Sequence, residues 1–189
     1  MAITVLTDYD AIKGALISWI TTYSGVNEAI FKNQDAPRPA RPYAAFLITS
    51  DGGRFGIDEA RQSYDAGSQV IQRNTAGLRK MNVQLDMYSE PAQAVGEKEA
   101  ADYLNNLLLT LDTVAVRDLF KDANLTVLDH TSVNRLDEQL GDRWERRAQV
   151  DLTLLYTGET FDDGGGSSGD WIETVEVPTT ENGNLTLNE

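Results

Sequence analysis

Residues 144 to 156 constrain the fold of this chain more than any other stretch. Read at every second position, one side is apolar apart from Arg146, and the other side is polar. Alternate Cβ atoms of a strand point to opposite faces, so this period predicts a β-strand with one covered face. At ~3.3 Å per residue it spans about 43 Å, far beyond a strand of about 5–6 residues. The apolar side consists of Trp144, Ala148, Val150, Leu152, Leu154 and Tyr156.

We therefore expect this strand at the centre of an antiparallel sheet, with one end projecting beyond its own domain. Apolar residues at helical spacing predict two main helices, over 7–24 and 94–111, and Thr113 begins a shorter one. Further strands are expected over 28–32, 43–49, 78–88 and 125–128, with a polar turn over 134–142. The weakly patterned residues 50–76 are interpreted as a strand or as a long hairpin arm that leaves the core.

The predicted fold class is α+β, with a single domain. An antiparallel (mixed) β-sheet is flanked by the two main α-helices and carries an extended arm and a C-terminal strand. Residues 1–157 form the expected core, and 158–170 form a linker by their Gly, Ser and Asp content. Residues 171–189 form the C-terminal strand and tail. A lone strand beyond a linker is marginal by itself, so residues 171–177 either return to their own sheet or add to a neighbouring subunit's edge.

Charge limits the partners of the chain. Its net charge is −14, and residues 148–189 carry nine acids and no Lys or Arg. Binding through phosphate neutralisation needs clustered cations, so a nucleic-acid wrapping surface is not expected. There is no run of ~18 apolar residues for a membrane span, and the first residues lack the pattern of a signal peptide. Without cysteine there are no disulfides or thiolate metal sites, and we expect a cytosolic origin.

Catalytic motifs are missing from the sequence. His130 is the only histidine, and no Gly-x-Ser-x-Gly or His-Glu-x-x-His motif occurs. Residues 164–169 are glycine-rich but lack the Lys and Ser/Thr of a phosphate loop. The sequence therefore predicts no enzyme, no cofactor and no metal site. A metal-dependent hydrolase that uses Asp and Glu is kept as the alternative from another class.

The densest basic and aromatic cluster is formed by Arg143, Arg146 and Arg147 around Trp144. These arginines can bind phosphate or a neighbour's carboxylates. Alternatively, they pair within the fold with Asp137, Asp142 or Glu145. The proline-rich residues 37–42 contain Arg38 and Arg41, and are either a docking loop or a rigid connection between two strands.

Three motifs in this order resemble the neck, or tail-terminator, proteins of long-tailed bacteriophages. They are Asn33 to Pro39 before Pro42-Tyr43, Arg143 to Leu152, and Trp171 to Val175. The first helix, with Trp19-Ile20, is similar too, so the resemblance covers nearly the whole chain. The glycine-rich linker and the residues after Pro178 depart from the family pattern.

The resemblance implies a structural protein of the virion, made in the host cytoplasm and located at the head-tail junction. Copies of the chain would form a ring, expected to be a hexamer, that caps the tail tube, ends its polymerisation and docks the head connector. DNA would pass through the lumen without specific binding. A tail-tube or adapter subunit of the same assembly is the alternative. The candidate inter-subunit or tube contacts are Arg38, Arg41, Arg143, Arg146, Arg147, Trp171, Ile172 and Val175.

Overall fold

The longest pairing without a register shift joins two 20-residue strands, β8 (Arg143–Asp162) and β4 (Val70–Ser89). A computed structural model describes residues 3–5, 8–34, 37–65, 70–91, 96–140 and 143–162. Within it, β4 and β8 are antiparallel from the Ser89–Arg146 pair to the Arg73–Asp162 pair. The long central strand is thus confirmed. It also continues through Asp162, so the first residues of the expected linker, from 158, are part of β8.

The sheet is mixed, and its main path runs β1-β8-β4-β3-β2. β3 (Tyr43–Asp65) pairs antiparallel with β4, whereas β2 (Glu28–Phe31) pairs parallel with β3. β1 (Ile3–Val5) lies against the end of β8. The same edge of β8 also pairs with β5 (Leu125–His130), β6 (Asn134–Arg135) and β7 (Glu138–Leu140). β8 therefore holds most of the sheet together.

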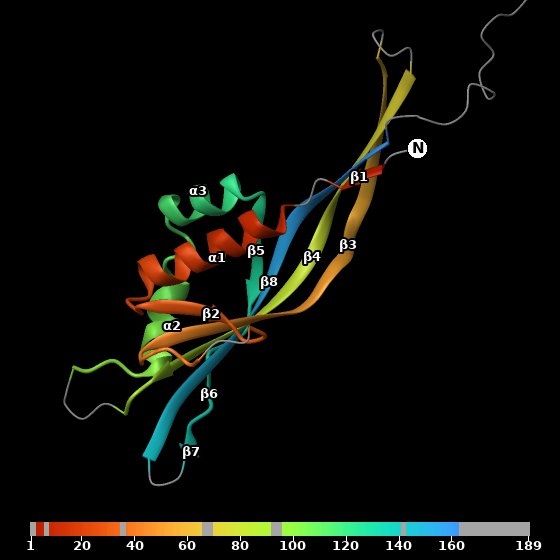
Figure 1. The fold of residues 1–189 in the computed structure, drawn as a ribbon. Helices are drawn as coiled ribbons and strands as arrows, with labels where there is room; N and C mark the ends of the chain where they lie inside the picture. The colour runs from red at the N-terminus through yellow and green to blue at the C-terminus, as the bar shows by residue number, and fades with distance from the viewer. Residues whose placement is uncertain are drawn as a thin grey trace, which may run out of the picture.

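Three helices cover one face of the sheet near its middle (Figure 1). They are α1 (Tyr9–Tyr23), α2 (Ala100–Leu109) and α3 (Val114–Asp122). The Asp8 side chain caps α1 by accepting a hydrogen bond from the Ala11 amide at 2.9 Å. At the centre of this layer, the fully buried Trp19 donates to Thr110 Oγ1 at 3.0 Å and packs edge-on against Phe120.

The expected alternation holds where the helices cover β8. Ala148, Val150, Leu152 and Leu154 are buried together with four alternate residues of β4, which are Met81, Val83, Leu85 and Met87. The expected alternation is wrong at the start of β8, where Trp144 is 52% exposed and its neighbour Glu145 is buried. There β8 has run past the helices, and among the described strands it pairs only with β7, so Trp144 lies outside the part of the sheet that the helices cover (Figure 1).

The sheet extends beyond the helical layer at both ends (Figure 1). At one end β3 and β4 form a long hairpin, with β1 and the end of β8 beside it. We call residues 50–65 and 70–80 the arm. At the other end β8 begins with only the short strands β6 and β7 beside it. The expected arm is therefore present, and the expected projection occurs at both ends of β8.

Two expected boundaries are wrong. The second helix was expected from residue 94, but α2 begins at Ala100, after Gly96 with its positive φ of 98°. Glu99 and Asp102 form a capping box there. Residues 134–142 were expected as a polar turn, but β6 and β7 pair with β8. Strand pairing uses backbone groups, so a polar sequence next to an open edge forms strands all the same.

Replacing Trp19 by Ala tests whether this residue holds the three helices together as one layer. We expect Trp19→Ala to lower the free energy of unfolding by about 3–5 kcal/mol, the cost of a large cavity. Leu109→Ala removes an apolar side chain that is 78% exposed, and should change it by less than about 0.5 kcal/mol. Equal effects in chemical denaturation would contradict this packing.

Candidate functional site

The proline-rich loop is fastened to the start of β8 by a buried carboxylate. Glu145 accepts a hydrogen bond from Arg41 Nε at 3.1 Å and a second contact from Arg41 Nη2. Arg41 Nη1 donates to Glu90 at 2.8 Å, and Arg38 Nη1 lies 3.6 Å from Glu145 Oε2. Glu90 first and Glu145 second raise the pKa of Arg41 through these contacts, against partial desolvation. The loop is therefore a rigid connection that covers the base of β8.

A second buried carboxylate joins three strands on the polar face of the sheet. Asp86 of β4 is fully buried. Its Oδ2 atom lies 2.7 Å from Lys32 Nζ and accepts from Arg147 Nη2 at 2.7 Å and from Arg147 Nε at 3.1 Å. The Tyr88 hydroxyl donates to the same oxygen at 3.2 Å. Asp86 thereby links β4 to β8 and to the residue that follows β2.

Two tyrosine rings fill the space between these carboxylates. Tyr43 and Tyr88 face each other across β3 and β4 with centroids 4.8 Å apart and planes 12° apart. Arg147 and Arg38 lie over the Tyr88 ring, at 5.7 and 6.0 Å from its centroid. Burial, followed by the Asp86 charge, raises the pKa of Tyr88 to about 12. Tyr88 therefore stays neutral and keeps its hydroxyl proton for Asp86.

We call these residues the polar-face cluster. It combines four cations with three acids, which are Lys32, Arg38, Arg41, Arg147, Asp86, Glu90 and Glu145. The charges are thus largely balanced inside the subunit. Arg38 is the most exposed of its three arginines, with 66% of its side chain accessible, against 25% for Arg41 and 28% for Arg147. Arg38 is therefore the arginine of this cluster best placed to reach another molecule.

Arg146 lies on the other face of β8. Its Nη1 atom contacts Asp137, and its Nε atom is 3.4 Å from Glu99 at the start of α2. Of the three acids expected to pair with the arginines, Asp137 does so with Arg146. Glu145 instead pairs with Arg41 and Arg38, and Asp142 lies outside the described residues. The sequence cluster is therefore divided between the two faces of the sheet.

The remaining candidates are Arg143, Trp171, Ile172 and Val175. Arg143 pairs with Leu140 through the backbone at the first position of β8. Trp171, Ile172 and Val175 lie outside the described residues.

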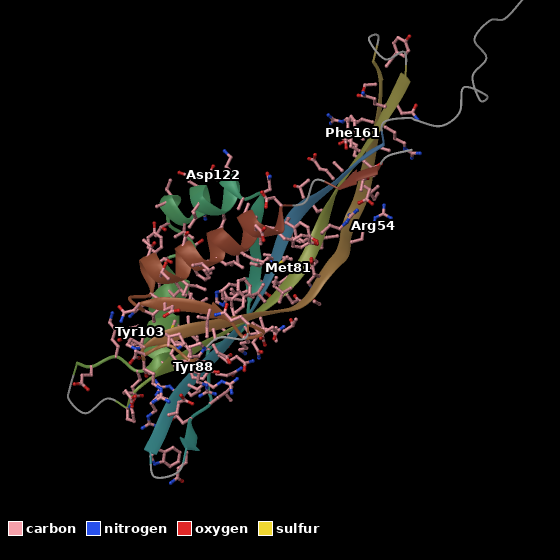
Figure 2. The ribbon with its side chains drawn as sticks, viewed as in Figure 1. Arg54, Met81, Tyr88, Tyr103, Asp122 and Phe161 are labelled. Atoms are coloured by element: carbon pink, nitrogen blue, oxygen red, sulfur yellow. The ribbon has the colours of Figure 1, made fainter. Side chains whose placement is uncertain are left out.

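Sequence analysis missed an exposed apolar surface on the arm. Ile57 is 90% exposed and Tyr64 is 64% exposed, and Phe55 and Leu78 are 42% and 44% exposed. Figure 2 shows the labelled Arg54 and Phe161 in this projecting part, away from the helices. The irregular β3–β4 register between Phe55 and Glu59 places Ile57 in a bulge. In the sequence, the only signal for this surface is the presence of apolar residues in a polar stretch. Whether those residues are exposed depends on the tertiary fold.

The alternative of a metal-dependent hydrolase concerns the acidic and histidine side chains in the part of the chain that the structure describes. No group of three or more His, Cys, Asp or Glu side chains with the geometry of a metal site occurs there. His130 is exposed, with Nδ1 3.0 Å from the Thr131 carbonyl oxygen. None of the described helices is long and apolar enough to cross a membrane.

Neutralising Asp86 tests the structural role of the polar-face cluster. Asp86→Asn leaves Lys32 and Arg147 without their buried counter-charge, and should lower the free energy of unfolding by about 3–5 kcal/mol. Asp112→Asn is the matched control, because Asp112 also pairs with an arginine but is 93% exposed, and it should leave the denaturation midpoint unchanged. An Asp86→Asn protein as stable as the wild type would contradict this assignment.

Comparison with known protein families covers most of the chain. The model of a family described as "Phage neck terminator protein" matches residues 9–184, whereas no curated protein matches the chain. The matched range begins with α1 and includes the proline-rich loop, the arm and the whole of β8. This chain therefore belongs to the phage neck terminator protein family.

Proposed function

We propose that copies of this protein form a ring that caps the tail tube of a long-tailed phage. The ring ends polymerisation of the tube and presents the surface on which the head connector docks. The family assignment supports a structural role in the phage neck, and hence in the virion. The observation that carries the proposal of a ring is the projecting arm.

The arm is unfavourable for an isolated monomer. A two-stranded ribbon is marginally stable in water unless something packs against it. Only residues 63–65 and 70–72 of the arm are two-stranded, because β8 pairs with β4 as far as the Arg73–Asp162 pair. The described helices do not cover the arm (Figure 1), and it exposes apolar side chains including Ile57 and Tyr64. Burying these side chains against another subunit would remove apolar surface from water, at roughly 25 cal/mol per Å². The arm is therefore our candidate for the main contact between subunits.

Charge also favours docking of the arm on another copy. Residues 50–80 carry five bases and four acids, whereas the whole chain has a net charge of −14. The arm is thus slightly positive and the remainder of each subunit is strongly negative. Opposite charges steer subunits together and disfavour contacts between two acidic bodies. The excess acid would also leave the lumen free of cations that hold DNA phosphates.

The arm's role is tested by making it polar without changing the fold. Ile57→Ser and Phe55→Ser together should weaken self-association at least about tenfold, which corresponds to only about 1.4 kcal/mol of lost contact. The thermal unfolding midpoint of the subunit should hardly change. Val114→Ser on α3 is the control, because Val114 is apolar and 73% exposed but lies off the arm. Native mass spectrometry across a dilution series measures the effect, and unchanged association of the arm variant would refute the role.

Capping is tested separately, by electron microscopy of the protein mixed with its tail tube protein. We expect rings that never lengthen by themselves, and tubes that stop growing where a ring is bound. Filaments of this protein alone would show a tube subunit instead, and rings that leave tube growth unchanged would contradict capping.

A further inference from the structure

An apolar groove of about 960 Å³ runs along β5 on the helix side of the sheet edge. α2 and α3, the turn between them and β8 contribute to its walls. Its apolar lining includes Leu108, Leu111, Phe120, Leu125, Val127 and Leu155. Its charged lining consists of two cations of α3, Arg117 and Lys121, and two acids, Asp112 and Asp129. Arg117 is paired with Asp112 and 67% exposed.

β5 also offers a free strand edge beside this groove. It pairs with β8 on one side, and among the described strands none pairs with its other side. A register irregularity between Val127 and Asp129 marks a bulge at Leu128, which is 47% exposed and lines the groove. A strand edge with unpaired N–H and C=O groups is a template for a further strand.

We propose that β5 and its groove bind residues 171–177 of a neighbouring copy as an added strand, and this rests on the proposed ring. Trp171, Glu173, Val175 and Val177 alternate on one side of that segment. In an added strand, the backbone of the segment pairs with β5, and the side chains of Trp171, Val175 and Val177 enter the groove. The segment and the groove are thus complementary in apolarity, and Glu173 on the same side can pair with Lys121 of the groove.

The end of β8 points to a neighbour as the donor. Asp162 lies in the projecting part of the molecule, and β1 occupies the edge of β8 at Thr160–Asp162. Leu125, the first residue of β5, pairs with Tyr156, six residues further back and thus about 20 Å away. The eight residues 163–170 span at most about 28 Å. To reach its own groove, the chain would have to reverse at Asp162 and pass around β1, whereas continuing outward takes it towards another subunit.

Cysteine cross-linking of the full-length chain tests this, because the natural chain has no cysteine. Thr126→Cys on β5 and Thr174→Cys in the segment are combined and treated with a short bismaleimide, which tolerates a shift of register. We expect a ladder of covalent multimers in denaturing gels. Adding Leu128→Asp should reduce the ladder at least about tenfold. The pair Ser18→Cys and Thr174→Cys, with Ser18 exposed on α1, is the control and should give no ladder.

The outcomes separate this inference from the proposed function. Rings of native mass without a ladder would overturn the inference and leave the ring intact. A cross-link within one chain would also overturn it, by showing that the segment returns to its own sheet. A ladder equally strong in the Ser18 control would mean unspecific contact and would overturn it too. A monomeric native mass would instead overturn the proposed ring itself.

Discussion

The backbone pairing of β8 with β4 is the constraint on which the rest of the structure depends. It runs without a register shift over most of both strands, while the helices cover only the middle of the sheet (Figure 1). A covered core needs only the middle of these strands. The remaining length must find partners outside the hydrophobic core, and it does so through β3, the short edge strands and buried charges. The elongated shape of the subunit is therefore a consequence of one long strand pair.

The polar face shows how such a sheet is stabilised without a second helical layer. Asp86 and Glu145 are both buried, and each is held by two basic side chains from other segments. Two stacked tyrosines fill the space between them. These arginines already have acidic partners inside the subunit, so they are less available for contacts between subunits. We therefore expect those contacts at the arm and at the edge of β5. Arg38 also contacts Glu145, but it is the most exposed arginine of the cluster and remains the one best placed to reach another molecule.

The sequence was most informative where local periodicity decides the structure. The alternation in residues 148–156 predicted the covered face of β8, and helical spacing predicted α1 with its buried Trp19. Local patterns failed where contacts with residues distant in the sequence determine the structure. Glu145 is buried because Arg41, about a hundred positions away, reaches it. The residues next to Glu145 in the sequence do not indicate this contact. The polar residues 134–140 form strands because β8 offers an open edge. The exposure of Ile57 follows from how far the arm extends past the helices.

The account's central claim is that the projecting strands are completed by other copies of the chain. Amide hydrogen exchange over β3 and β4, compared between dilute monomer and assembled protein, tests it most directly. The account predicts that amides of residues 50–65 exchange quickly in the monomer and become protected on assembly, while those of residues 81–88 are protected in both. Arm amides that exchange at the same rate in both states would contradict it.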